Sequence, residues 1–141
     1  MDHSPAETVS ARGHEHVQAT HESTFEVTTD DYLTPAGDCI LAVEAARAPA
    51  DFDDAVVAAC RDHGATVVAT VEAGGRREQV RGRGHPDLSF DSDRSAVCRT
   101  SDYVDDRTVM VGAERAAAGL DRGLVAALAN DADCTFTLTV E

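Results

Sequence analysis

The sequence predicts one α+β domain, predominantly β, in which a single structural unit occurs twice. Short motifs recur in the same order about 70 residues apart. Within each recurrence, the hydrophobic pattern indicates a strand, a turn, a strand, a helix and a strand. The length of 141 residues suits one compact core. We therefore expect a tandem duplication of a β-turn-β-α-β unit that forms a pseudo-twofold sandwich or barrel-like sheet with two helices.

Five pairs of motifs define the repeat. They are residues 12–14 and 83–85, 31–33 and 102–104, 38–43 and 107–112, 52–57 and 120–125, and 70–72 and 139–141. The offset between partners drifts from 71 to 68 or 69 while the order is kept. Such a drift indicates an old duplication followed by small insertions and deletions in loops. The prediction is one domain over residues 1–141, with repeats at about 11–73 and 82–141.

The first repeat has a strand, a second strand and a helix in its hydrophobic pattern. Residues 22–28 alternate between the two faces of a half-buried strand. Residues 39–43 are apolar on both faces, which is typical of a central strand. Residues 51–63 carry apolar side chains at helical spacing and acidic side chains in the first turn, and Gly64 ends this helix.

The second repeat follows the same plan. Residues 95–100 and 109–111 predict the counterpart strands, and leucines at 120, 124 and 128 predict the second helix. Residues 134–140 alternate strictly between apolar side chains and threonines, which predicts a strand with one buried face.

Two further segments complete the predicted chain. Gly74 and Gly75 predict a tight turn, and residues 76–83 then form the second strand of a hairpin. Residues 1–10 are polar and predict a flexible end.

The composition favours a protein of the cytosol of a halophile, and the alternative is an acidic mesophilic protein from a GC-rich genome. Acidic residues number 26 against 12 basic ones, all of them arginine, and the formal net charge is −14. Dense carboxylates keep a protein surface hydrated, and concentrated salt screens their mutual repulsion.

The lack of a recognisable targeting signal and the spacing of the cysteines agree with that location. The first 16 residues lack the apolar stretch of a signal peptide, and no apolar run approaches the length of a membrane helix. The four cysteines form no Cys-x-x-Cys pair, which is typical of reduced thiols. We predict a cytoplasmic protein without a membrane partner.

Three runs carry a family resemblance over nearly the whole chain, from about residue 11 to residue 141. They are residues 12–43, which include LTPAGDCILAV, residues 82–90 (GRGHPDLSF) and residues 101–120. With these runs the chain resembles the archaeal family known as domain of unknown function 371. The resemblance implies an archaeal origin and a mainly β fold, and it implies no activity. It also leads us to expect asparagine where His16 stands.

Histidine, aspartate and cysteine side chains form the first candidate site. His14 and His16 are two residues apart, so in an extended segment both imidazoles face the same side. Imidazole, carboxylate and thiolate groups suit zinc or a similar divalent ion. The candidate metal ligands are His14, His21, Cys39 and His85, with Asp38 beside them.

The same residues allow other interpretations. His14 and His85 occupy equivalent positions of the repeat and could act together in acid–base chemistry. Alternatively, Arg-Gly-His is a turn that the fold needs twice. Cys39, at a turn-to-strand junction, is either a nucleophile or a thiol packed in the core.

Arginines form the second candidate site. Arg76, Arg77, Arg81 and Arg83 lie within eight positions. Guanidinium groups bind phosphates, so Arg77, Arg81 and Arg83 are candidates to bind a small anionic molecule or an RNA backbone. No aromatic residue stands among them to stack on bases, and pairing with neighbouring carboxylates is the alternative.

These candidates leave two classes of function open. The first is a small ligand-binding or interaction module, which could be a homo-oligomer. The second is a small enzyme or divalent-metal protein that uses His14, His21, Asp38, Cys39 and His85. The second class requires at least three of these side chains to meet at one concave surface. The sequence does not decide whether the protein is an enzyme.

Overall fold

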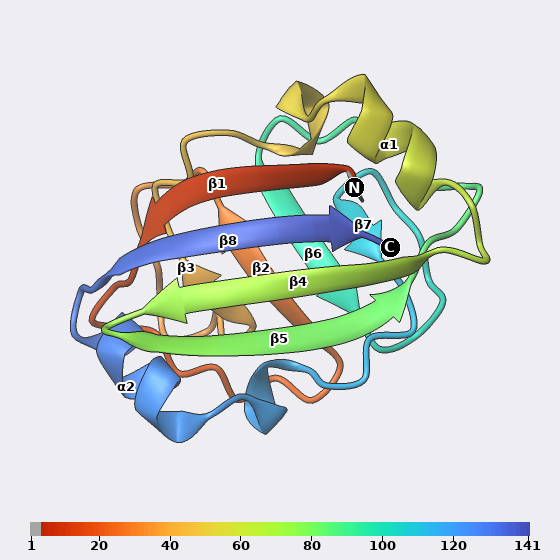
Figure 1. The fold of residues 1–141 in the computed structure, drawn as a ribbon. Helices are drawn as coiled ribbons and strands as arrows, with labels where there is room; N and C mark the ends of the chain where they lie inside the picture. The colour runs from red at the N-terminus through yellow and green to blue at the C-terminus, as the bar shows by residue number, and fades with distance from the viewer. Residues whose placement is uncertain (1–3) are drawn as a thin grey trace.

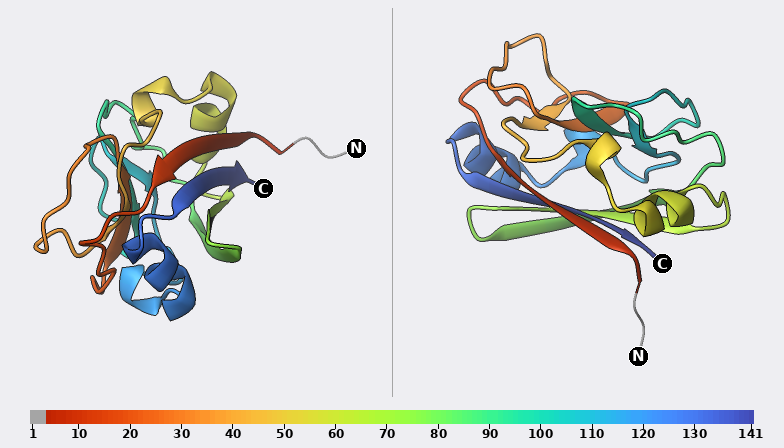
Figure 2. Two further views of the ribbon diagram at one scale, coloured as in Figure 1. Left: turned by 90° about the vertical axis from the view of Figure 1, so that its left-hand side faces the viewer. Right: turned by 90° about the horizontal axis from the view of Figure 1, so that it is seen from above.

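The computed structural model describes residues 4–141, which form two four-stranded sheets packed face to face (Figures 1 and 2). The first sheet has the order β1-β8-β4-β5 and is antiparallel throughout. Its strands are β1 (Ala6–Arg12), β4 (Thr66–Ala73), β5 (Arg76–Arg83) and β8 (Asp133–Val140). The mainly β prediction with two helices is confirmed.

The second sheet has the order β3-β2-β6-β7. Its strands are β2 (Thr24–Thr28), β3 (Ile40–Ala42), β6 (Ser95–Arg99) and β7 (Thr108–Met110). The central pair, β2 and β6, is antiparallel, and each outer strand is parallel to its neighbour. Single bridges, Arg12 to Val43 and Arg83 to Val111, join the two sheets at two corners. Over residues 4–141 the sheets do not close into a barrel.

Two short helices lie at opposite corners of the sandwich (Figure 1). The 3-10 turn η1 (Pro49–Asp51) precedes α1 (Asp54–Cys60), and η2 (Ala117–Gly119) precedes α2 (Arg122–Ala129). Each α-helix begins at an aspartate, Asp53 or Asp121, whose carboxylate accepts a backbone N–H of the first turn. Such caps satisfy amides that have no partner within the helix.

The core lies between the sheets and includes at least one face of each strand, and β7 is buried on both faces. In β8, Cys134, Phe136, Leu138 and Val140 are buried, whereas the threonines between them are half-buried, which confirms the predicted alternation. From the second sheet, Phe25 is fully buried. Each large apolar side chain that leaves water contributes about 1.5–3 kcal/mol to stability.

The N-terminal segment differs from its prediction. Residues 1–10 are polar and predict a flexible end, but residues 6–12 form β1 and pair along their whole length with β8. The edge of β8 that faces away from β4 offers a row of backbone N–H and C=O groups, which pair with another strand whatever the polarity of its side chains. Residues 1–3 of that prediction lie outside the described residues.

The elements from β1 to β4 (the first half) and from β5 to β8 (the second half) follow the same order. Strand pairing relates their residues: Glu26 pairs with Ile40, and Val97 pairs with Thr108. Ile40 therefore corresponds to Thr108, whereas the motif match pairs Thr108 with Cys39. We take the backbone pairing as the guide to which residues correspond, because β3 and β7 have few residue types in common.

Candidate functional site

Each Arg-Gly-His motif packs its glycine against the end of the helix of the other half. A Cβ on Gly13 would lie 2.0 Å from the carbonyl oxygen of Leu128 in α2. On Gly84, it would lie 2.2 Å from the carbonyl oxygen of Cys60 in α1. The histidine that follows each glycine donates its backbone N–H to that carbonyl at 2.9 Å. The motif therefore satisfies a helix C-terminus in both halves.

Three of the candidate histidines also stabilise their own turns. His14, His21 and His85 each accept, through Nδ1, the backbone N–H of the residue two positions further along, at 3.0–3.1 Å. In its neutral form, each ring therefore carries its proton on Nε2 and can donate one hydrogen bond from there.

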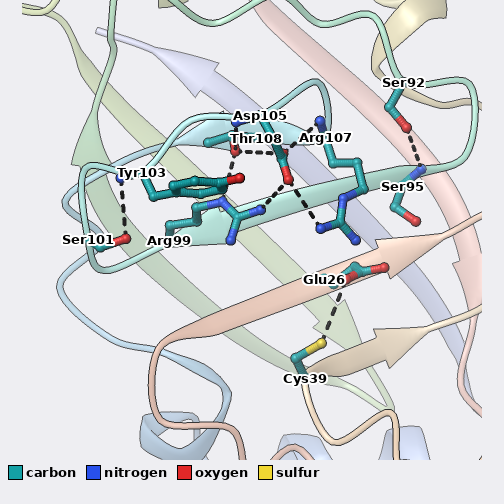
Figure 3. Close-up of polar contacts among 10 residues, drawn as sticks. All are labelled: Glu26, Cys39, Ser92, Ser95, Arg99, Ser101, Tyr103, Asp105, Arg107 and Thr108. Carbon is teal, nitrogen blue, oxygen red and sulfur yellow. Dashed lines mark hydrogen bonds and ion pairs between the residues drawn. The ribbon is translucent and has the colours of Figure 1, made fainter.

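The candidate residues around Cys39 are joined mainly by backbone contacts. The carbonyl oxygen of Asp38 accepts the N–H groups of Thr20 and His21 at 3.0 and 3.2 Å. The Cys39 thiol is half-buried and donates to Glu26 Oε1 at 3.6 Å (Figure 3). Burial, followed by the charge of Glu26, raises the pKa of Cys39 to about 11. The thiol is thus protonated near neutral pH, which disfavours nucleophilic attack.

The five His, Asp and Cys candidates do not meet in one place. His14 lies at the end of α2 and His85 at the end of α1, at opposite corners of the sandwich. Across residues 4–141, no three His, Cys, Asp or Glu side chains are grouped so that they could hold a metal ion. The ring of His16 lies 5.1 Å from that of His14.

Three of the four clustered arginines are paired with carboxylates. Arg76 contacts Asp121 at 3.2 Å, Arg77 contacts Glu72 at 3.9 Å, and Arg81 contacts Glu141 at 3.1 Å. Arg83, at the end of β5, has no carboxylate of residues 4–141 within 4.0 Å.

Arg83 lies in an open cleft of about 410 Å³. The cleft is lined by His63, Arg83, His85, Pro86 and Asp102. These residues come from the loop after α1, from the end of β5 and the loop behind it, and from the loop after β6. One guanidinium and two imidazoles therefore converge there with one carboxylate, an arrangement suited to an anion.

Sequence reasoning missed two of these residues. His63 belongs to no motif, and its loop lies beside the second Arg-Gly-His motif, whose Gly84 packs against the end of α1. Asp102 stands in the repeated Asp-Tyr pair, so the repeat marked its loop without indicating a partner for it.

The free guanidinium of Arg83 has a local cause. In the first half, Arg12 has the corresponding place on β1 and contacts Glu44 at 3.2 Å. The residue corresponding to Glu44 is Gly112, and both have a left-handed backbone, with φ of 55° and 58°. The Arg83 guanidinium lies over Gly112, where a Cβ would approach its Nε to 2.9 Å. Arg83 thus lacks the carboxylate that neutralises Arg12.

With this geometry established, comparison with known proteins identifies the family. The model of the family described as Domain of unknown function (DUF371) matches residues 9–141. The chain belongs to this family. It is also similar to "Uncharacterized protein MJ0206" of the archaeon Methanocaldococcus jannaschii, with 33% identity over 132 residues, which cover 94% of this chain and 97% of that protein. The family predicted from the sequence is confirmed, and this relative is archaeal.

A second polar cluster in this DUF371 protein holds the loop between β6 and β7 (Figure 3). Asp105 contacts Arg99 at 2.9 Å, Arg107 at 3.1 Å and the Thr108 hydroxyl at 3.0 Å. Burial by itself raises the pKa of Asp105, but hydrogen bonds from Arg107 and Thr108 outweigh it and lower the pKa to about 2. The Arg99 guanidinium also lies 4.9 Å from the centre of the Tyr103 ring. These groups satisfy one another and stabilise the loop.

The helices of this DUF371 protein are short. Within residues 4–141, none has the length and apolar character needed to cross a membrane.

Proposed function

We propose that this protein is a small binding module that holds an anionic small molecule through Arg83. The observation that carries the proposal is an unpaired guanidinium in an open cleft of a strongly acidic protein. Nine of the 12 arginines lie within 4.0 Å of a carboxylate among residues 4–141. Arg122 instead donates to three backbone carbonyls, and Arg61 to one. Within the same residues, Arg83 donates no side-chain hydrogen bond.

The surface around Arg12 in the first half differs from the surface around Arg83, and this difference supports the assignment of the anion site to Arg83. Around Arg12, the chain has Glu15 and Glu44. Around Arg83, the corresponding residues are Pro86 and Gly112. Two carboxylates of the first half are thus replaced by uncharged residues, although Asp87 stands where the first half has His16, and the change leaves the Arg83 guanidinium without an ion-pair partner in a chain of net charge −14.

The chemistry of the cleft favours a phosphate or carboxylate group. A guanidinium offers two parallel N–H donors, and His85 adds a donor at Nε2 because its Nδ1 accepts a backbone N–H. A small molecule fits better than an RNA backbone, since Arg77 and Arg81 are engaged by carboxylates and leave no row of free cations.

Isothermal titration with inorganic phosphate and pyrophosphate tests the proposal, at one potassium chloride concentration at which the protein is folded. We expect Arg83→Ala to weaken binding at least tenfold, which is about 1.4 kcal/mol, since a charge-assisted contact is lost. The matched control is Arg12→Ala, which removes the corresponding but paired arginine and should leave binding unchanged. No binding by the unaltered protein, or equal binding by the Arg83 variant, would overturn the proposal.

We also infer that the two halves arose by tandem duplication and are related by a pseudo-twofold axis. Beyond the Arg-Gly-His turns, a second shared contact supports this. Glu7 binds Arg47 in the first half, and Glu78 binds Arg115 at 3.2 Å in the second. The acidic, lysine-free composition further supports a cytoplasmic location in a salt-rich cell.

A further inference from the structure

We propose that the ligand of the cleft is a phosphorylated polyol of the size of a pentose phosphate, with Asp102 accepting hydrogen bonds from its hydroxyl groups. This inference rests on the proposed anion site at Arg83 and assigns a role to the one acidic residue of the same cleft. The starting observation is that Asp102 is exposed in the cleft and, among residues 4–141, has no arginine or histidine within 4.0 Å. In particular, it forms no ion pair with Arg83.

An ionised carboxylate only accepts hydrogen bonds. Beside an anion site, it therefore repels the anion itself and attracts a part of the ligand that donates. The cleft thus combines two groups that can bind an anion, Arg83 and His85, with one that only accepts hydrogen bonds, Asp102. A phosphate with neighbouring hydroxyl groups satisfies both kinds of group within one small molecule.

The size of the cleft agrees with such a ligand. Its volume of about 410 Å³ falls in the range of roughly 300–1,000 Å³ that is usual for sites of small organic molecules. This is more than a single tetrahedral anion requires. Pro86 provides an apolar wall against which the carbon skeleton of a sugar can lie.

Asp102 is also held in place from both sides. The carbonyl oxygen of the preceding Ser101 accepts the N–H of Gly112 at 3.0 Å, and the Ser101 hydroxyl accepts the N–H of Tyr103 at 3.3 Å. The Tyr103 ring in turn lies over Arg99, which Asp105 anchors. Figure 3 shows the contacts of Ser101, Tyr103, Arg99 and Asp105 in this loop. The backbone that carries Asp102 is held in this way, so the loop loses little conformational entropy when the carboxylate binds a hydroxyl group.

Three probes separate the parts of the inference: inorganic phosphate, ribose 5-phosphate and ribose, each measured by titration at one salt concentration. We expect ribose 5-phosphate to bind at least tenfold more tightly than inorganic phosphate, and ribose to bind more weakly than either. Asp102→Ala should reduce this ratio to about one. Because removing a negative charge also strengthens phosphate binding, the ratio of the two affinities is the quantity that decides.

Asp31→Ala is the matched control, since Asp31 is the exposed counterpart of Asp102 in the first half. It changes the net charge equally and should leave the ratio unchanged. If Asp102→Ala left the ratio of the two affinities unchanged while phosphate still bound, the polyol proposal would be wrong. The proposed anion site at Arg83 would then remain supported. Absence of binding by all three probes would overturn both. Both variants alter exposed side chains, and equal melting temperatures would confirm that they fold.

Discussion

At the scale of single residues, the difference between Glu44 and Gly112 decides which arginine is free. Both positions have a left-handed backbone, which a non-glycine residue adopts at a cost of roughly 1–2 kcal/mol. Glu44 bears that cost and pairs with Arg12, whereas Gly112 avoids it and leaves Arg83 unpaired. An anion site can thus arise from the loss of one carboxylate, without any change of fold.

This comparison predicts the effect of restoring the missing carboxylate. Gly112→Glu should pair with Arg83 and weaken phosphate binding at least tenfold, because the ligand then competes with an internal carboxylate. The group that a new Cβ would meet is the mobile end of the Arg83 side chain, so the variant should fold. Titration calorimetry measures the change.

Gly112→Gln is the matched control for Gly112→Glu. It has a similar size and the same backbone strain but no charge, and it should retain most of the phosphate binding. Unchanged binding by the glutamate variant would contradict the role assigned to Arg83.

At the scale of elements, the loops carry the candidate site and the strands hold the loops in place. The loop between β6 and β7 depends on Asp105, which joins Arg99 on one strand to Thr108 on the next. The loop after α1 is held by Gly84, which packs against the end of that helix. Such contacts let two separate loops meet at one cleft.

The lowered pKa of Asp105 predicts how this loop responds to acid. Its folded pKa of about 2 lies below the ordinary value of 3.8. The ionised carboxylate therefore stabilises the fold above about pH 4, and this stabilisation is lost as pH falls through about 2. Asp105→Asn should cost about 1–3 kcal/mol at pH 7, and the difference from the unaltered protein should shrink between pH 4 and pH 2. Urea unfolding at several pH values measures it.

Asp106→Asn provides the control for Asp105→Asn. The Asp106 side chain is exposed, and its neutralisation should change stability little at any of these pH values. If the Asp105 variant differed from the unaltered protein by the same amount at pH 7 and pH 2, the ionised network would not be the source of stability.

At the scale of the whole molecule, the net negative charge is the main influence on the stability of the fold. A net charge of −14 on 141 residues produces mutual repulsion that opposes the compact state, and the nine ion-paired arginines of residues 4–141 offset only part of it. Salt should therefore matter more for stability here than in a protein of balanced charge.

We predict that the melting temperature rises with potassium chloride from dilute buffer to multimolar concentration. Screening shortens the range of repulsion from about 30 Å at 0.01 M to about 3 Å at 1 M. Calorimetry along a potassium chloride series measures the trend, and sucrose of equal osmolality is the control for effects of water activity. A melting temperature independent of salt would contradict both the screening argument and the halophilic interpretation.

Local patterns in the sequence by themselves determined most elements of this protein. The alternation in β8, the spacing of apolar residues in α2 and the paired glycines at 74 and 75 each depend on neighbours along the chain. The family was evident from contiguous runs for the same reason. The edge strand β1 was missed because its pairing comes from β8 and not from its own polar side chains.

Only the tertiary structure decided the candidate site. His63, Arg83 and Asp102 come from three separate segments, and no spacing rule relates them. His14 and His85, which the sequence made prominent, stabilise two helix ends at opposite corners through their backbone N–H groups, and the cleft is lined by His85 but not by His14. The physical reason is that a motif shows which groups a chain carries, whereas packing determines which of them meet and which remain unpaired. For Arg83, that outcome depended on a glycine of the neighbouring strand end.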